Sequence, residues 1–326
     1  MKKFVRLIFL GVLILTILTT IGHLCASEKE YPNQPISLVI PGDPGSVTDL
    51  ISRVLIDLLS QSLGQPIVPT NKPGGGMLIG GNTVVTSKPD GYTIGMLMVP
   101  TAIPETYRYF RTPPYSSTDL KPICRVANFV GVMIVKSDAP WNSLKDVIEY
   151  ARKNPGMKFA IGGKGGSPHQ LMLTIAKKEN IRFIEVPHSS DSDQLMQILG
   201  GHIPITIVTY PTAKAQIQAG NVKVLTVYSS KRFELLPKVP TVVELGYVPG
   251  HYPAIGLFAP KSIPDSIVKK IDEKVKDICN MASFRQKLEN LGFEVDYENT
   301  NEYRESLQRY KEDIYTHLKE LGFVKE

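Results

Sequence analysis

The fold is decided by residues 36–68, ISLVIPGDPGSVTDLISRVLIDLLSQSLGQPIV. The stretch opens with the apolar run Ile36–Ile40, which is typical of a buried strand, and continues through a Gly/Pro turn at residues 41–46. Apolar residues then recur at the spacing of one helix face over residues 50–59, and Gly64 marks the end of that helix. The last two residues begin a second strand. This succession predicts the βαβ unit of a parallel sheet.

The same order recurs along the chain and predicts further elements. Near its end, apolar residues from Tyr303 to Leu321 have near-heptad spacing, and we favour a helix packed on its own sheet over a coiled-coil seam. Predicted strands lie at residues 93–98, 129–135, 158–161, 183–186, 203–208, 222–227 and 256–259, and predicted helices at 77–86, 143–153 with Ser143 as N-cap, 192–199 and 212–218, with one more ending near Glu179 and another opened by Pro264.

Composition excludes several classes of protein. The chain has 326 residues, of which 42% are hydrophobic and 21% charged, and this composition excludes intrinsic disorder. A single apolar stretch approaches spanning length, which excludes a polytopic membrane protein. Because no run is rich in Lys and Arg, the sequence disfavours nucleic-acid binding. The length fits one large domain or two smaller ones.

The N-terminus has the order of a secretory signal peptide: basic residues, an apolar run over residues 7–21, and small residues after it. We predict that residues 1–27 are a signal peptide and that the mature chain is exported to the periplasm or extracytoplasmic space. The apolar run is shorter than the about 20 residues of a transmembrane helix, which disfavours a retained anchor. Lipid attachment at Cys25 is disfavoured as well, because the bulky Leu24 stands where a small residue is expected.

The mature chain predicted in this way carries 34 basic and 31 acidic residues, a net charge of +3. It keeps two cysteines, Cys124 and Cys279. Two cysteines can form at most one disulfide bond, which is not the framework of a disulfide-stabilised protein, and a chain of this size does not need one. We therefore expect two small buried apolar side chains.

Three glycine-rich loops, at residues 41–46, 73–76 and 162–167, each follow a predicted strand and precede a predicted helix. The first turn of a helix has unpaired N–H groups and partial positive charge, and glycines let a ligand approach that backbone closely. One such loop is usually a plain turn, but three together favour a site for a carboxylate or phosphate. None of them matches a P-loop or a dinucleotide-binding motif.

Side chains near these loops have two interpretations each. Asp49 either caps the following helix or contacts a ligand amine or hydroxyl. His169 either donates to an anion or braces its loop, and Lys164 is either a cation beside the anion or a solvated lysine. No histidines have zinc-ligand spacing, and no Gly-x-Ser-x-Gly elbow is present. The sequence therefore predicts a binding protein without metal or cofactor, and not an enzyme.

Several motifs resemble the substrate-binding receptors of tripartite tricarboxylate transporters. The similarity runs from about Tyr31 to the C-terminus, almost the whole mature chain. It is carried by YPNQPI at residues 31–36, IPGDPGSVTD at 40–49, LGQPIV at 63–68, NKPGGG at 71–76, KPDGYT at 88–93, LGGHI at 199–203 and LPKVPT at 236–241.

The resemblance implies an α/β fold of two domains, like a type II periplasmic binding protein, with central sheets flanked by helices and a ligand cleft between the domains. It implies one domain from residues 28–128 and 253–326 and a second from 129–252. The cleft would close on a small organic carboxylate by a hinge motion, and the receptor would deliver it to a separate membrane permease. We expect a monomer.

The resemblance also implies the site residues, with some departures from the family pattern. Ser46 stands where the family has a second glycine, and His188, Ser189 and Tyr210 also differ from it, so the ligand need not be the usual one. Main-chain N–H groups around Gly45 and Gly166 are expected to hold the anion. The predicted ligand-binding residues are Pro44, Gly45, Ser46, Asp49, Gly75, Thr101, Gly165, Gly166, Ser167, His169, Ser189 and Thr209.

Two other functions stay open at this point. A receptor of this kind can present its bound form to a membrane sensor instead of a permease, and the sequence does not separate the two. An enzyme on the same fold would use His169 or His188 as general base, but no partner nucleophile is visible in the sequence.

Overall fold

The computed structural model describes residues 31–108, 112–162, 164, 166–188, 190–229, 231–247, 254–320 and 322–323. The predicted signal peptide at residues 1–27, with Cys25, lies outside these residues. Over the described part of the chain, none of the helices combines the length and the apolar character needed to span a bilayer.

The first lobe is built on a mixed six-stranded sheet with the order β11-β4-β10-β3-β1-β2. The strands β1, β2 and β3 are parallel, whereas β10 runs antiparallel to both β3 and β4. Its strands are β1 (Ile36–Ile40), β2 (Ile67–Asn71), β3 (Thr93–Met98), β4 (Leu120–Phe129), β10 (Ala254–Pro260) and β11 (Phe293–Glu298), and its helices are α2 (Val47–Leu63), α3 (Leu78–Val85), α4 (Val99–Ala102), α9 (Asp265–Asn280), α10 (Ala282–Leu291) and α11 (Thr300–Glu320), with short 3-10 turns η1 (Gly75–Met77), η2 (Pro104–Tyr107) and η3 (Ser117–Asp119).

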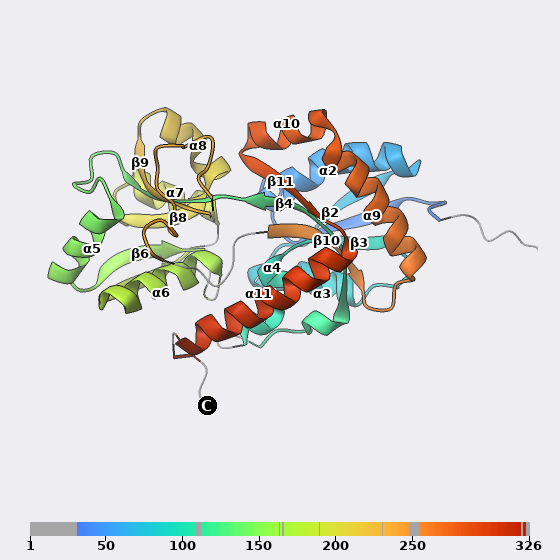
Figure 1. Cartoon of the computed structure of the whole chain (residues 1–326), viewed down its shortest axis with the longest axis horizontal. Coiled ribbons are helices and arrows are strands. Elements are labelled where there is room, and N and C mark those ends of the chain that lie inside the picture. Colours follow the sequence, from blue (N-terminus) through green and yellow to red (C-terminus); the bar gives the residue numbers. More distant parts are fainter. Residues whose placement is uncertain are drawn as a thin grey trace, which may run out of the picture.

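The second lobe is built on a mixed five-stranded sheet with the order β7-β6-β8-β5-β9. Here β6 is parallel to β7 and β8, and β5 is antiparallel to β8 and β9. Figure 1 shows this lobe on the left and the first lobe on the right. Its strands are β5 (Gly131–Lys136), β6 (Met157–Ile161), β7 (Phe183–Pro187), β8 (Ile205–Thr209) and β9 (Val222–Tyr228), and its helices are α5 (Leu144–Lys153), α6 (Ser167–Glu179), α7 (Asp191–Leu199) and α8 (Tyr210–Gln218).

The helix ends follow from local chemistry. Ser46 precedes α2 in extended conformation and its side chain accepts the N–H of Asp49, while Gly64 ends the helix in the left-handed region at a φ of 70°. The predicted N-cap of α5 is confirmed: Ser143 accepts from Asp146, and the Asp146 carboxylate accepts the Ser143 N–H in return. Such a capping box satisfies donors that the helix itself leaves unpaired.

Each lobe has its own apolar core. In the first, the α2 side chain Leu55 and the α9 side chain Ile271 are fully buried against the sheet with Leu38. In the second, Phe159 and Ile175 belong to one buried cluster, and a further cluster covers the other face of the sheet. Burial of each such side chain contributes about 1.5–3 kcal/mol, so each sheet can hold its own helices in place.

Most predicted elements are confirmed, with corrections to the sheets and to three segments. The sequence predicted parallel sheets, but both are mixed. It also missed most of β4, all of β11 and the helix α10 between β11 and α9. The two cysteines are free and buried, as expected. Helix α11 packs on its own sheet through Tyr303, whose ring lies 5.4 Å from that of Phe258.

Three kinds of contact join the lobes. The chain passes directly from β4 into β5 through Val130. The end of α11 reaches α6, where His317 Nε2 lies 2.7 Å from Thr174 Oγ1 (Figure 1). Lys214 on α8 donates to the carbonyl of Asn290 on α10 at 2.6 Å. These contacts place the strand ends of one lobe opposite those of the other in this structure.

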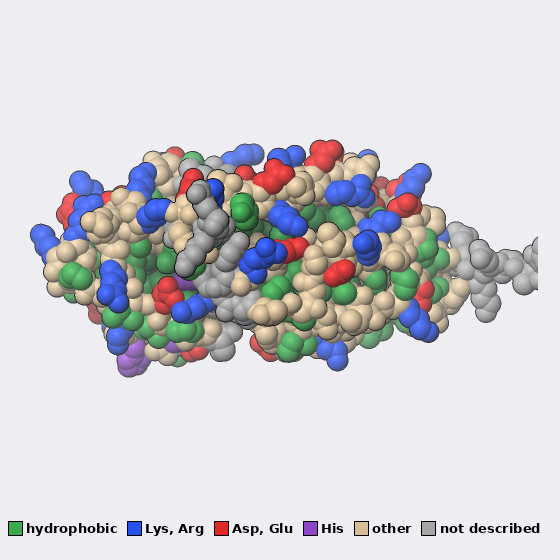
Figure 2. Space-filling view, turned by 90° about the horizontal axis from the view of Figure 1, so that it is seen from below, with side chains coloured by type: hydrophobic (Ala, Val, Ile, Leu, Met, Phe, Trp, Pro, Cys, Tyr) green, Lys and Arg blue, Asp and Glu red, His purple; other side chains and the backbone are tan. Residues whose placement is uncertain are grey.

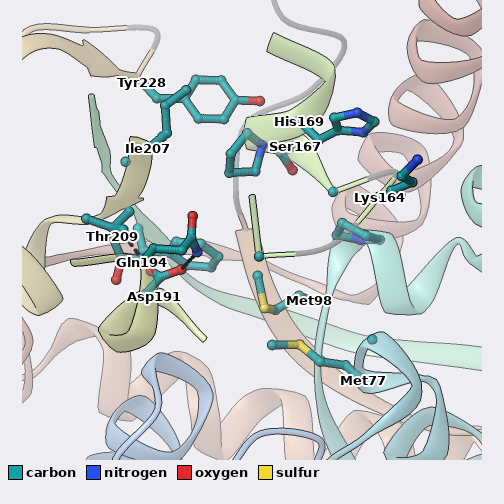
Figure 3. Close-up of a pocket in the computed structure, with 18 of the residues that line it drawn as sticks. Met77, Met98, Lys164, Ser167, His169, Asp191, Gln194, Ile207, Thr209 and Tyr228 are labelled. Atoms are coloured by element: carbon teal, nitrogen blue, oxygen red, sulfur yellow. Dashed lines mark hydrogen bonds between the residues drawn. The ribbon is translucent and has the colours of Figure 1, made fainter. Parts of the chain in front are cut away.

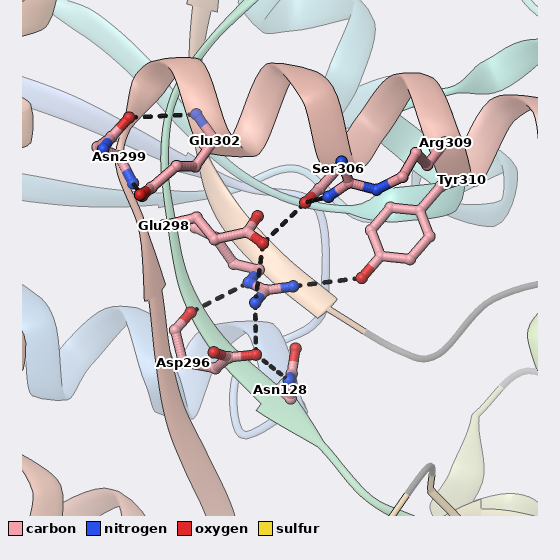
Figure 4. A network of polar contacts seen from close by, with 9 residues as sticks. Asn128, Asp296, Glu298, Asn299, Glu302, Ser306, Arg309 and Tyr310 are labelled. Atoms are coloured by element: carbon pink, nitrogen blue, oxygen red, sulfur yellow. Dashed lines mark hydrogen bonds and ion pairs between the residues drawn. The ribbon is translucent and has the colours of Figure 1, made fainter.

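Charged side chains of both signs are interspersed on the face shown in Figure 2. A charged network in the first lobe surrounds Arg125 on β4 (Figure 4). Its guanidinium lies 2.6 Å from Asp296 and 3.1 Å from Glu298 on β11, and it also donates to the Tyr310 hydroxyl on α11. This network ties one edge of the sheet to the last long helix.

Candidate ligand-binding site

A pocket of about 170 Å³ lies between the two lobes (Figure 3). One water needs only about 10–15 Å³ on this measure, so the pocket has room for a small organic molecule. The first lobe contributes Gly76, Met77, Met98, Pro100, Tyr107 and Phe129, and the second contributes Gly131, Gly162, Lys164, Gly166, Ser167, Pro168, His169, Asp191, Gln194, Ile207, Val208, Thr209 and Tyr228.

The pocket forms where the carboxyl ends of parallel strands meet. In the second lobe, β6, β7 and β8 are adjacent and parallel, and each is followed by a short turn and a helix. In the first lobe, the turns after β2 and β3 supply Met77 and Pro100. Ligands of open α/β sheets bind beyond the carboxyl ends of the strands, so the topology itself predicts a site at this place.

Helix α6 begins at the pocket wall. Its N-cap, Gly166, has no side chain that could cap the first turn, and Pro168 occupies the second position of that turn. Gly166, Ser167 and Pro168 all line the pocket. The helix dipole places partial positive charge there, and the Ser167 hydroxyl adds a polar group. This end of the pocket therefore suits an anion.

His169 and Lys164 both contact Glu185 on β7. His169 Nε2 lies 3.0 Å from one carboxylate oxygen, and Lys164 Nζ lies 3.4 Å from the other. Burial alone would raise the pKa of Glu185, but the hydrogen bond and charge of His169, with the charge of Lys164, hold it below its ordinary value. The contact favours the bracing role for His169. Lys164 remains 57% exposed and lines the same end of the pocket as α6.

The opposite end of the pocket carries a carboxylate, as Figure 3 shows. Asp191 is the first residue of α7, and its Oδ2 accepts the Thr209 N–H at 2.7 Å. Burial raises the pKa of Asp191 above its ordinary value, although the hydrogen bonds from Thr209 work against that shift. The sequence analysis missed Asp191 and Gln194. The signal for Asp191 was available, because it is an acid directly after the N-cap of a predicted βα turn.

The loop at residues 41–46, which the sequence analysis predicted to bind the anion, uses its main-chain donors within the loop. The Gly45 N–H donates to Asp49 Oδ2 at 2.8 Å, and the Ser46 N–H donates to the Asp43 carbonyl at 3.0 Å. Both main-chain donors of the expected anion cradle therefore already have acceptors within the loop. With Pro44 and Asp49, they are absent from the described lining of the pocket.

Asp49 has the capping role, the first of the two considered. It also accepts from Arg53 Nε at 2.8 Å and from Asn71 Nδ2 at 3.1 Å, and only 2% of its surface is exposed. Burial would raise its pKa, but these hydrogen bonds and the one from Gly45 hold the pKa below the ordinary value. The Asp49 carboxylate therefore stabilises the loop by accepting these hydrogen bonds.

The other predicted residues divide into three groups. Gly166, Ser167, His169 and Thr209 line the pocket. Gly75 and Thr101 do not, although their neighbours Gly76 and Pro100 do. Gly165 and Ser189 lie outside the described residues. Over the described ranges, no three His, Cys, Asp or Glu side chains are placed to hold a metal ion.

Two mixed sheets flanked by helices, with a pocket lined from both lobes, define the α/β class of periplasmic binding proteins. The family model of the tripartite tricarboxylate transporter family receptor matches residues 51–322. The chain belongs to this family.

Individual relatives agree with this assignment. The Cupriavidus necator "UPF0065 protein in gbd 5'region" is 30% identical over 303 residues, which cover 92% of this chain and 91% of the relative. The structure of R. palustris Rpa4515 with adipate has a TM-score of 0.83 at 25% identity and covers 90% of this chain and 99% of that one. The periplasmic binding protein BugD has a TM-score of 0.79 at 27% identity, with 91% and 100% covered.

Proposed function

We propose that this protein is an exported solute receptor that binds a small organic carboxylate between its lobes and delivers it to a tripartite tricarboxylate-type permease. The observation that carries this proposal is the pocket at the N-terminus of α6. An uncapped helix start with a neighbouring lysine attracts a carboxylate, and apolar side chains from both lobes can cover its carbon chain. The solved relative that holds adipate supports the same ligand class.

We also propose that residues 28–128 with 253–326, and residues 129–252, are domains that move against each other. Apart from Phe129, the last residue of β4, the two sheets divide the described strands in this way, and β4 continues into β5 through Val130. A hinge at this crossing would narrow the pocket around a bound ligand, since a few residues between rigid lobes can absorb the rotation.

The geometry at the two candidate bases favours release of the ligand unchanged. His169 points one ring nitrogen at Glu185, and His188 Nδ1 lies 3.1 Å from Asp193, which is outside the described lining of the pocket. A general base must reach the proton that it removes. We therefore propose a binding role and no catalytic one.

A matched pair of variants at Ser167 tests the proposed anion site. Ser167→Asp places a negative charge at the start of α6, whereas Ser167→Asn places a neutral side chain of similar size at the same position. We expect thermal shift and calorimetry with mono-, di- and tricarboxylates to find a ligand for the natural protein. Ser167→Asp should weaken it about 100-fold more than Ser167→Asn, because a buried like charge faces the carboxylate.

The proposal fails on either of two results. One is that no carboxylate of the panel stabilises or binds the natural protein. The other is that both Ser167 variants lose affinity equally, because the loss then reflects side-chain size and not charge. Native mass spectrometry of freshly purified protein adds an independent check through the mass of any co-purified ligand.

A further inference from the structure

The hydrogen-bond acceptors at one end of the pocket are side chains of the protein, Asp191 and Gln194. Asp191 takes the Thr209 N–H on Oδ2, and its Oδ1 lies 3.3 Å from the side-chain amide of Gln194. Exchanging the oxygen and nitrogen of that amide relative to Figure 3 satisfies it better, because its nitrogen then donates to Thr206 and Ala160 while its oxygen accepts from Gly162. In that orientation the Gln194 oxygen takes the position beside Asp191 Oδ1. Two acceptors then lie side by side, and no hydrogen bond joins them.

The charge of Asp191 has no counterion on the described chain. Among the described lining residues, Lys164 is the single Lys or Arg, and its cation pairs with Glu185 at the other end. Taking an ionised carboxylate out of water without a cation is costly. The raised pKa of Asp191 has this cause, since burial is its largest contribution. A ligand that brings a cation to Asp191 would remove the cost.

The pocket is therefore polarised along its length. Asp191 and Gln194 lie at one end, Lys164 and the start of α6 at the other, and Met77 and Met98 lie against the space from the first lobe (Figure 3). A dicarboxylate without another group would place an anion or an apolar carbon beside Asp191. An ammonium group supplies both a charge and several donors for the two oxygens.

Building on the proposed function, we propose that the ligand is an amino-substituted carboxylate, with its ammonium on Asp191 and its carboxylate at the N-terminus of α6. A hydroxyl could donate one hydrogen bond to Asp191 but would leave its charge uncompensated. The rank order of ligands that differ in one substituent therefore tests the proposal directly.

The experiment uses succinate, malate and aspartate, which carry hydrogen, hydroxyl and ammonium on the same carbon, and the corresponding series from glutarate to glutamate. Calorimetry on the mature protein measures each affinity. We expect the ammonium member of at least one series to bind most tightly. We expect Asp191→Asn to weaken it about tenfold, because a charge-assisted hydrogen bond becomes a neutral one. The unsubstituted acid should bind that variant at least as well as the natural protein.

Asp193→Asn is the matched control, because it removes the same charge from the same first turn of α7 at a residue outside the described pocket lining. It should leave both affinities unchanged. The unfolding temperature without ligand shows whether each variant is folded, and the comparison between ligands cancels any loss common to both.

Equal or tighter binding of the unsubstituted acids overturns the inference while the proposed function stands, and so does an equal loss for all members of a series in Asp191→Asn. If no carboxylate binds at all, with or without an amino group, the proposed function falls and this inference falls with it. If the hydroxyl member binds most tightly, Asp191 accepts a hydrogen bond from a neutral hydroxyl group, and the ammonium assignment is overturned.

Discussion

Replacing Arg125 by methionine tests what holds β4, β11 and α11 together. The guanidinium contacts Asp296 and Glu298, donates to the Asp296 carbonyl at 3.2 Å, and donates to the Tyr310 hydroxyl at 3.2 Å (Figure 4). Methionine keeps much of the aliphatic volume but removes every one of these contacts. It also removes the one cation that contacts both carboxylates.

The expected loss follows from the burial of the three charges. Breaking a fully buried ion pair by removing one partner costs about 3–5 kcal/mol. The Arg125 side chain is 10% exposed and that of Glu298 18%, but Asp296 is 39% exposed, so solvent screens part of the effect. We therefore expect a loss of about 2–3 kcal/mol in the free energy of unfolding at neutral pH.

Urea unfolding followed by far-UV circular dichroism measures this loss as a shift of the midpoint. Arg232→Met is the matched control, because Arg232 pairs with Glu244 at the surface, where both side chains are more than 40% exposed. Such a pair contributes about 0–1 kcal/mol. If Arg125→Met loses no more stability than Arg232→Met, the network does not stabilise the fold and the reasoning is wrong.

Three further predictions use the same unfolding measurement or simple labelling. Asp49 has a lowered pKa in the folded state, so the stability that its charge contributes is present above its ordinary pKa and is lost as the pH falls through its folded-state pKa. Asp49→Asn should therefore be less stable than the natural protein at pH 7. It should also lose less stability than the natural protein between pH 5 and pH 2. Burial lowers the pKa of His317, so the stability that depends on its neutral form is lost as the pH falls below 6.5; His317→Gln, which can still contact Thr174, should flatten that part of the profile. Burial raises the pKa of Cys279 to about 12 and that of Cys124 well above its usual range. Iodoacetamide at pH 8 should therefore modify neither thiol before urea unfolds the chain. If mass spectrometry shows that either thiol of the native protein is modified before unfolding, the prediction is wrong.

The elements that the sequence predicted well are those whose pattern is local. The apolar run Ile36–Ile40, the helix after it and the left-handed Gly64 depend on neighbours within a few positions, and the structure has them where the pattern puts them. The N-cap at Ser143 has the same origin. Hydrophobic period and capping chemistry act over one turn or one strand, so a single sequence is enough to read them.

The missed strands depend on residues far away in the chain. β4 contains Lys121, Pro122 and Arg125, which are unusual in a central strand. Arg125 can be buried there only because Asp296 and Glu298 arrive on β11 to neutralise it. β11 itself is short and acidic, so its pattern alone does not predict a strand.

The candidate site divides along the same line. From the residues alone came the glycine-rich turns, the expectation of an anion at a helix start, and the family resemblance that the comparisons confirm. Only the tertiary structure decided which turns line the pocket: the loop at 162–167 does, whereas Gly45 and Asp49 satisfy each other within the loop at 41–46. It also placed Asp191 opposite α6. Local pattern determines each turn and its donors. Which turns meet depends on strand order and on lobe contacts between segments 76 and 143 residues apart, and no short-range rule contains them.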